Sequence, residues 1–387
     1  MTNWKDPKRY FWFLAALVPL LVMASWLLVE ATGLGVFWWL GPLLVFVGMP
    51  IIDYLVGIDR TTSAGDAHID LDRDHPLYKW ATYLYVPHQY LSLIFACWLW
   101  SGGGWLSMSL TDKFGLMATV GISGGIGINA AHELGHRRVR MEKRLSKLAL
   151  AQTCYGHFFV EHNRGHHVRV ATPEDNASSR LGESFYGFLP RSVIGGMRSA
   201  WTLETRRLAR LHKSPWTRKN NILNAWLLSA VLFAGLALWF GPTVLPWLVG
   251  QAIVGICLLE MANYVQHYGL RRQLLPDGRY ERIDIRHSWN CDYLVTNVFL
   301  FHLQRHSDHH TNPQRRFAYL RGIDRAPQLP AGYATMFLLA AIPPFWRRVM
   351  DPRVISYYGG RIDRAALDPR RKTALLRKYS DRNVVLS

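Results

Sequence analysis

Long apolar runs constrain the fold of this chain more than any other feature of its sequence. Half of its 387 residues are apolar. Many of these residues gather in stretches of about 20, the length at which an α-helix crosses a hydrocarbon core of roughly 30 Å. Six such stretches lie near residues 11–31, 34–54, 80–101, 114–131, 221–240 and 243–262. The sequence therefore predicts an all-α integral membrane protein with six transmembrane helices.

The distribution of Lys and Arg predicts the orientation of these helices. The basic segments are the N-terminus, the 55–79 loop, residues 132–220 and the residues after 263. The alternate connections are short and nearly free of positive charge: 32–33, 102–113 and 241–242. Because cytoplasmic loops carry the excess of Lys and Arg, we expect both termini in the cytoplasm. We expect one membrane domain, 1–387, with a helical cytoplasmic cap made of residues 132–220 and 263–387.

Composition excludes several other classes of protein. The net charge of +18 lies in loops beside the predicted spans. Anionic lipid and the positive-inside bias account for it, so nucleic acid is not expected as a partner, whereas an acidic soluble protein is. The four cysteines are scattered, at Cys97, Cys154, Cys257 and Cys291. They form no CxxC pair, which argues against a disulfide framework, a zinc ribbon or a rubredoxin-type cluster.

Most of the sixteen histidines lie in four polar motifs. These are HELGH (His132, His136), EHNRGHH (His162, His166, His167), NYVQHYG (His267) and FHLQRHSDHH (His302, His306, His309, His310). Neutral imidazole is the commonest metal ligand among side chains. Since every motif falls on the predicted cytoplasmic side, the sequence predicts a polynuclear metal site there.

The spacing within the motifs suggests how the rings are presented. His132 and His136 are four residues apart, so they share one face of a helix and can bind one ion together. His162 and His166 repeat this step, and His167 points in another direction. The last motif combines a three-residue and a four-residue step. Such clusters can serve two neighbouring ions, and the candidate ligands are His132, His136, His162, His166, His167, His267, His306, His309 and His310.

Other polar residues are expected to orient these rings or to lie apart from them. Imidazole ligands need a partner on the second ring nitrogen. The candidates for this task are Glu133, Glu161, Glu260, Asn263, Asp292, His302 and Asp308. His302 shares a helix face with His306 but is left out of the ligand set. Single histidines in loops are interpreted as ordinary residues: His68, His75, His88, His157, His212 and His287.

The nature of the metal follows from the donor set. HELGH matches HExxH, in which two histidines hold zinc and the glutamate is a general base. A zinc peptidase would leave the other three motifs unexplained, and an all-histidine zinc site needs three or four ligands, not nine. A thiolate set for zinc or copper(I) is missing, and iron suits many imidazoles with open positions for dioxygen. Two iron ions are therefore predicted.

The four motifs, in this order among six predicted spans, resemble those of the integral-membrane alkane 1-monooxygenases, relatives of xylene monooxygenase and the membrane fatty acid desaturases. EHNRGHH and LQRHSDHH carry most of the likeness, which covers residues 10–345. One departure is Gln266, where this family commonly has glutamate, so this chain offers no carboxylate at this position. The resemblance assigns iron ligation to the nine histidines.

The resemblance also implies a reaction and its partners. It implies oxygen-dependent hydroxylation of linear alkanes to primary alcohols at a non-haem diiron centre, in the inner membrane of a bacterium. Electrons would come from rubredoxin, a separate protein or a further domain, and from its NAD(P)H-dependent reductase. The alkane would arrive from the lipid bilayer.

Selection of a chain end requires a shaped apolar pocket, since a methyl group offers no hydrogen bond. We expect Trp38, Trp39 and Phe46 of the second span to set its length. The glycines of the fourth span, Gly121, Gly124 and Gly125, either allow close helix packing or open a groove for the alkane.

Three alternatives remain at this point. A membrane fatty acyl desaturase shares the frame and the clustered histidines, but the HYG and HSDHH stretches favour the hydroxylase. An intramembrane zinc protease rests on HELGH alone. A metal transporter would place histidines along a path through the spans and not on one side.

Overall fold

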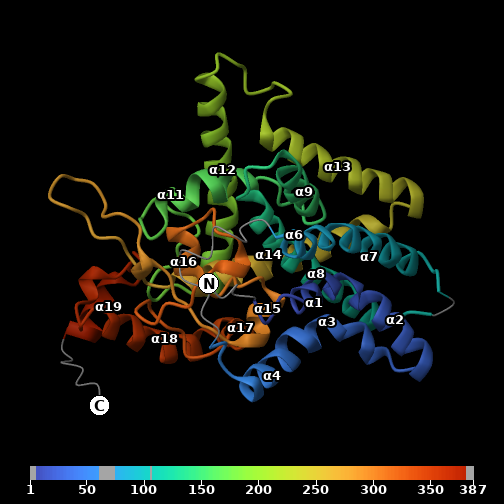
Figure 1. Ribbon diagram of the computed structural model, residues 1–387, viewed down its shortest axis with the longest axis horizontal. Coiled ribbons are helices and arrows are strands. Elements are labelled where there is room, and N and C mark those ends of the chain that lie inside the picture. Colours follow the sequence, from blue (N-terminus) through green and yellow to red (C-terminus); the bar gives the residue numbers. More distant parts are fainter. Residues whose placement is uncertain (1–5, 61–74, 105–106, 381–387) are drawn as a thin grey trace, which may run out of the picture.

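The structure is a computed structural model that describes residues 6–60, 75–104 and 107–380 (Figure 1). Within these residues it contains helices and isolated β-bridges but no β-strand, so the predicted all-α class is confirmed. His68, interpreted above as an ordinary loop histidine, lies outside the described residues.

The helices are described here in the order of the chain. Those of the first third are α1 (Trp12–Leu17), α2 (Leu21–Thr32), α3 (Leu40–Leu43), α4 (Met49–Val56), α6 (Pro76–Tyr83), α7 (Tyr85–Trp100) and α8 (Leu110–Gly135). Next come α9 (Arg140–Ala151), α10 (Phe158–Glu161), α11 (His167–Arg169), α12 (Phe185–Ala209), α13 (Asn221–Phe240) and α14 (Val244–His267). The last are α15 (Leu294–Phe299), α16 (His306–Thr311), α17 (Tyr333–Ala341), α18 (Pro343–Tyr357) and α19 (Lys372–Ser380).

Several short turns of other helix types join or interrupt these helices. The 3₁₀ turns are η1 (Val18–Leu20), η2 (Gly35–Trp39), η5 (Ile285–His287), η6 (Phe317–Tyr319) and η7 (Ile362–Arg364). The π-helical turns are η3 (Leu44–Gly48) and η4 (His162–His166). The turn η3 precedes Pro50, which has no N–H to donate to the carbonyl group of Phe46 four residues earlier. A π-turn at this point lets the helix continue past the missing donor.

Five helical stretches in the described part of the chain are long and apolar enough to cross a membrane. They are Trp12–Thr32, Gly35–Val56, Leu110–Gly135, Asn221–Phe240 and Val244–His267. The region of the third predicted span, 80–101, is divided at Leu84 between α6 and α7, and α7 has 16 residues. The total of six spans therefore stays a prediction.

Helices α8 and α14 pack along each other in the middle of the molecule (Figure 1). A Cβ atom on Gly121 would lie 2.5 Å from the Cβ of Val254, and one on Gly125 would lie 2.9 Å from the carbonyl oxygen of Gly255. Both glycines therefore allow the two backbones to approach closely. This contact brings the C-terminal ends of the two helices, with their histidines, side by side.

The cap surrounds these ends with short helices and loops from distant parts of the sequence. Figure 1 shows α2, α3 and α7 at one end of the molecule and the C-terminal helices α18 and α19 at the other, with α16 between them. The loop before α16 is held to α8, because Asn129 Nδ2 donates to the carbonyl oxygen of Leu300 at 2.7 Å. Two consecutive residues of this loop, Phe301 and His302, have positive φ angles of 49° and 53°. The fourth histidine motif is thus placed by a strained corner that is fixed from several sides.

Candidate metal centre

The structure gathers the nine predicted ligands into two groups. The five-histidine group consists of His132, His136, His162, His167 and His309. The four-histidine group consists of His166, His267, His306 and His310. Within each group the potential ligand nitrogens lie within 4.8 Å of one another. Rings separated by up to 177 positions in the sequence thus meet at one place in the fold.

Spacing along a helix explains part of this division. His132 and His136 fall in the same group, at the end of α8, as their four-residue step predicts. On α16, His306 and His310 are also four residues apart, and their Nε2 atoms lie 2.9 Å from each other. His309 points from the same helix into the five-histidine group. A single turn of helix therefore supplies both groups.

The second motif differs from the expected pairing. The sequence predicted that His162 and His166 share a face, but they belong to different groups, and His162 pairs with His167 at an Nε2···Nε2 distance of 3.0 Å. The physical reason is the π-turn η4, His162–His166. Its i→i+5 hydrogen bonds bring residues five apart onto one face, whereas an α-helix does so for residues four apart.

The Nε2 atoms of the five-histidine group form a chain of close approaches. The distances are 3.0 Å for His136–His162, 3.0 Å for His162–His167, 3.1 Å for His167–His309 and 2.9 Å for His309–His132. A neutral imidazole nitrogen either donates one proton or accepts one, so hydrogen bonds can account for at most half of these contacts. Neighbouring ligands about 2.1 Å from one ion, at right angles, lie about 3.0 Å apart. The donor set therefore fits a metal ion.

The four-histidine group also fits a metal ion, but through a different arrangement of its rings. The Nδ1 atom of His166 lies 2.9 Å from the carboxylate of Asp175, and Nδ1 of His267 lies 3.2 Å from the carbonyl oxygen of His287. The Nε2 atoms of both rings are buried and have no hydrogen-bond partner in the described structure. A ring whose Nδ1 is held and whose Nε2 is free is oriented to bind a metal through Nε2.

Three of the rings favour the neutral form, which a metal ligand requires. Burial, followed by the repulsion of neighbouring histidines, lowers the pKa of His162, His306 and His310 well below its usual value. Protonation would block the nitrogen lone pairs, so neutral rings keep the whole set available for metal binding.

Asp175 is the functional residue that sequence analysis missed. It lies in the loop before α12, nine positions after its partner His166, and no helical spacing connects the two. Ser178 donates its hydroxyl to the same carboxylate at 2.6 Å. Burial alone would raise the pKa of Asp175, but His166 and the hydrogen bonds lower it to about 2. An ionised carboxylate thus stands behind one ring of the four-histidine group.

The residues expected to orient the rings have other partners in the described structure. Glu133 binds Arg137 at 2.5 Å, and Glu161 binds Arg169 at 2.8 Å. Asp292 and Asp308 form ion pairs with Arg305 and Arg315, both at 2.6 Å. Glu260 accepts hydrogen bonds from Tyr155 and Asn263, and His302 lies near Phe317, Lys8 and Asp59. Their expected role toward the histidines stays a prediction.

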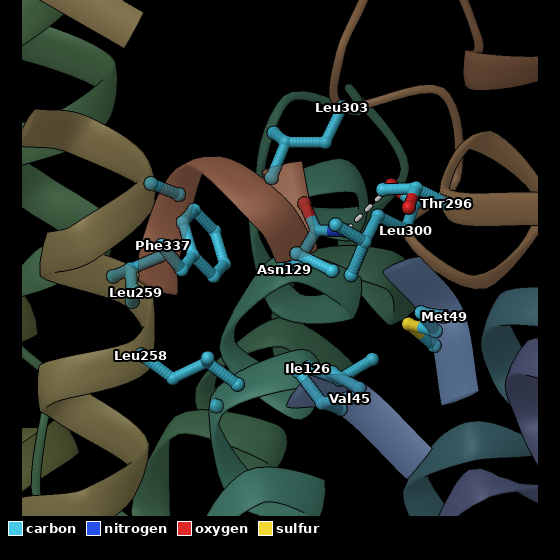
Figure 2. A pocket seen from close by; sticks show the side chains of 13 residues that line it. Val45, Met49, Ile126, Asn129, Leu258, Leu259, Thr296, Leu300, Leu303 and Phe337 are labelled. Carbon is cyan, nitrogen blue, oxygen red and sulfur yellow. Dashed lines mark hydrogen bonds between the residues drawn. The ribbon is translucent and has the colours of Figure 1, made fainter. Parts of the chain in front are cut away.

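An apolar cavity lies beside the centre, between α8, α14 and the segment from α15 to α17 (Figure 2). Its volume is about 30 Å³, and its walls include Val45, Met49, Ile126, Leu258, Leu300 and Phe337. Two polar side chains in the wall are already engaged, since Asn129 binds the Leu300 carbonyl and Thr296 binds Asp53. Asn129 and Ala262 precede His132 and His267 by three and five residues. At about 1.5 Å of helix rise per residue, these two wall residues lie within about two turns of a histidine of each group.

Of the residues expected along a substrate channel, Gly125 lines this cavity. Gly121 packs against α14, and a Cβ on Gly124 would lie 3.1 Å from Thr153. Trp38 is buried in a different apolar cluster, Trp39 lies against Gly115, and Phe46 packs on the main core. Close helix packing therefore describes Gly121 and Gly124, and Gly125 serves both packing and the cavity.

Comparison with known proteins agrees with this geometry. The sequence model of the fatty acid desaturase family matches residues 112–340. An alkane 1-monooxygenase of Acinetobacter baylyi is 42% identical over 97% of this chain and 91% of its own length. Those of Ectopseudomonas oleovorans and Pseudomonas putida are 41% and 40% identical over 97% of this chain and 92% of theirs.

The matched residues of the family model include all nine histidines, and the relatives extend the likeness across nearly the entire chain. The apolar helices and the buried histidine groups are what a membrane-bound, metal-dependent oxygenase requires. The chain belongs to the fatty acid desaturase family and, within it, to the alkane 1-monooxygenases.

Proposed function

We propose that this protein hydroxylates the terminal carbon of linear alkanes, using dioxygen and electrons from rubredoxin, at two iron ions held by the nine histidines. One observation carries the proposal: two converging sets of neutral imidazoles lie beside an apolar cavity. Relatives about 40% identical that are named alkane 1-monooxygenases support the substrate. We further propose that the site faces the cytoplasm of a bacterium, as the basic loops indicate.

The two groups would each hold one ion. The five-histidine group offers five nitrogens and the four-histidine group four, with Asp175 and the His287 carbonyl orienting two of the rings. Bound iron would supply the reduction of dioxygen and the oxidation of an unactivated C–H bond. The chain itself keeps the rings neutral, fixes their tautomers and excludes bulk water from the centre.

The apolar cavity would bind the end of the alkane chain. Its free surface is formed by hydrocarbon and aromatic groups, so it offers no hydrogen bond that would favour a polar substrate. Each methylene group contributes about 1–3 kcal/mol of discrimination in such a pocket, so the enzyme should accept a range of neighbouring chain lengths. Leu258 lies in the wall facing α8.

Substitution of Leu258 tests the cavity. Leu258→Phe should shift the preferred alkane to shorter chains and Leu258→Ala to longer ones, measured as the alcohol formed from a mixture of C6 to C14 alkanes. Leu238→Phe, on the 88% exposed Leu238 of α13, is the matched control. An unchanged chain-length profile in both Leu258 variants would exclude this cavity as the binding site.

A second, wider cavity suits the electron donor. Its volume is about 560 Å³, and Arg180, Arg271 and Lys372 line it together with Asp175. Because Asp175 is hydrogen-bonded to His166, this surface leads directly to the four-histidine group. We propose it as the docking site of rubredoxin, with basic side chains meeting an acidic partner.

Charge reversal tests the docking site. Arg180→Glu and Arg271→Glu should slow rubredoxin-driven turnover and reduce its dependence on salt, while turnover with a small chemical reductant stays the same. Lys143→Glu, at an exposed position of α9, is the control. Unchanged rubredoxin kinetics in both cavity variants would place the docking site elsewhere.

The decisive experiment for the function is a metal analysis combined with product analysis. Purified protein should contain close to two irons per chain and form 1-octanol from octane, with oxygen, NAD(P)H, reductase and rubredoxin all required. Two irons with desaturated acyl chains and no alcohol would favour the desaturase alternative, which the family match keeps open. One zinc per chain and no alcohol would exclude both the hydroxylase and the desaturase.

A further inference from the structure

A further small cavity touches the histidine centre, and several polar side chains stand in its wall. Its volume is about 20 Å³, and its walls include Tyr155, Glu161, His162, His166, Glu260 and Asn263. A space of this size with polar walls can hold a water molecule. On α14, Glu260 stands opposite Leu258, which lines the apolar cavity, because two residues span about 200° of a helix. The same helix therefore separates an apolar compartment from a polar one.

Glu260 is the unusual residue of the polar cavity. It is 2% exposed, and its Oε1 atom accepts hydrogen bonds from the Tyr155 hydroxyl at 2.7 Å and from Asn263 Nδ2 at 3.1 Å. The other carboxyl oxygen, Oε2, is buried without a hydrogen-bond partner within 3.5 Å in the described structure, and Ser192, in the wall of the same cavity, is a further hydroxyl donor close to this carboxyl group. Burial of a carboxyl group with one unpartnered oxygen disfavours the ionised form and favours the neutral acid.

The neighbouring acid Glu161 differs from Glu260 in having a basic partner. Its Oε1 atom forms an ion pair with Arg169 at 2.8 Å, whereas the ion pairs of the described residues include none with Glu260. The other titratable groups near Glu260 are Tyr155, His157, His162 and His166, from the segment around α10, and Cys257, one turn earlier on α14. No Lys or Arg is among the residues that line this cavity, so no permanent positive charge faces Glu260 within it.

The proposed reaction needs protons at a buried site. One alkane, one dioxygen, two electrons and two protons give one alcohol and one water: a C–H bond and the O–O bond break, a C–O and an O–H bond form on the product, and the second oxygen atom leaves as water. The electrons come from rubredoxin. The protons must cross a buried region that the apolar cavity cannot serve.

We propose that Glu260 is the proton-relay carboxyl of this enzyme, which passes a proton through the polar cavity to the oxygen being reduced at the histidine centre. Glu260 then regains a proton from solvent beside the partly exposed Asn176 and Ala177, which line the same cavity. Tyr155 and Asn263 orient the carboxyl group so that Oε2 faces the cavity. This inference rests on the proposed hydroxylation.

The test combines infrared spectroscopy with turnover of the full-length protein. Glu260→Gln keeps the shape of the side chain but carries no transferable proton. The metal-free wild-type protein should show the C=O stretch of a protonated carboxylic acid at pH 7 that is missing in Glu260→Gln. In the iron-loaded enzyme this variant should lower 1-octanol formation by about 100-fold or more and raise the solvent isotope effect, with iron content unchanged.

Asp351→Asn is the matched control. Asp351 is also a buried carboxyl bonded to a tyrosine, Tyr268 at 2.8 Å, but it lies on α18, away from the polar cavity. This variant should retain wild-type turnover and isotope effect. If Glu260→Gln does not fold, Glu260→Asp decides: the relay predicts reduced turnover with a raised isotope effect.

The outcomes separate this inference from the function on which it rests. Wild-type turnover and isotope effect in a folded Glu260 variant would overturn the relay, as would an infrared spectrum in which Glu260 is ionised at pH 7. Absence of alcohol from the wild-type enzyme would overturn the hydroxylase proposal, while the infrared band of the metal-free protein would still report the protonation of Glu260.

Discussion

The five-histidine group and the four-histidine group prepare for a metal in different ways. In the first, Nε2 atoms crowd together at 2.9–3.1 Å. In the second, two rings have unpartnered Nε2 atoms and are oriented from behind by Asp175 and by the His287 carbonyl. Asp175 also borders the wide basic cavity.

The difference teaches that the two groups depend on different parts of the protein. The five-histidine group has one ligand more than a four-coordinate ion uses, so it tolerates the loss of one ring. The four-histidine group has no such reserve and relies on residues outside the histidine motifs. It is also the group to which the basic cavity leads. We therefore expect the two groups to respond unequally to substitution.

Removal of single ligands should show the largest effect. His267→Ala leaves three histidines in its group, so iron should fall from two toward one per chain and 1-octanol formation should be lost. His136→Ala leaves four, and iron should stay closer to two per chain. The measurement is iron content by mass spectrometry alongside octane turnover. Equal iron loss from both variants would contradict the proposed inequality.

Removal of the carboxylate behind His166 should have an intermediate effect. Asp175→Asn takes away the charge that orients this ring, and such changes lower metal affinity or activity by about 10- to 100-fold. Only the ion held by the four-histidine group should bind more weakly. Titration with a competing chelator should then show one lowered and one unchanged iron affinity. Asp363→Asn, in the wall of the same basic cavity, serves as the control. Two equally weakened ions would show that the groups are not independent.

Substitution of Glu204 should have the smallest effect, a loss of folding stability. This loss should affect both histidine groups equally. Glu204 of α12 binds Arg164 at 2.7 Å, in the π-turn that supplies rings to both groups, and Arg207 at 2.6 Å. Burial opposes its ionisation, yet hydrogen bonds from Arg207 and Asn221 lower its pKa from 4.5 to about 2. The stabilisation is therefore present above pH 4.5 and is lost as the pH falls toward 2.

Glu204→Gln should thus lower the stability of the folded protein at pH 7 by about 1–2 kcal/mol. Thermal unfolding followed by circular dichroism should give a lower Tm than wild type at pH 7, and the difference should shrink as the pH falls from 4.5 toward 3. A Tm difference that grows on acidification would contradict the depressed pKa.

Much of the fold was predictable because membrane spans and helix periodicity are local signals. The apolar runs predicted helices that the structure contains, and the spacing of HELGH predicted that His132 and His136 fall in one group. The third predicted span is shorter as a single helix, because a turn at Leu84 divides it, which hydropathy does not reveal.

The features that the sequence did not predict depend on contacts between distant segments. Asp175 reaches His166 through a loop whose path no periodicity describes. The division of His162 and His166 depends on a π-turn, and α-helical spacing assigns them to one face. The apolar cavity is formed by five separate segments. The sequence does not show how these segments pack, so it could not exclude Trp38 and Trp39 from the cavity.

The π-turn η4 also limits how this motif can change in evolution. A π-turn closes its hydrogen-bonded ring with one residue more than an α-turn, so deletion of a single residue between His162 and His167 would return the segment to ordinary helix. His167 would then lie four residues after His162 and share its face, and His166 would lose the direction that the π-turn gives it toward the four-histidine group. The length of the stretch between these histidines is therefore as restrictive as the identity of the histidines themselves.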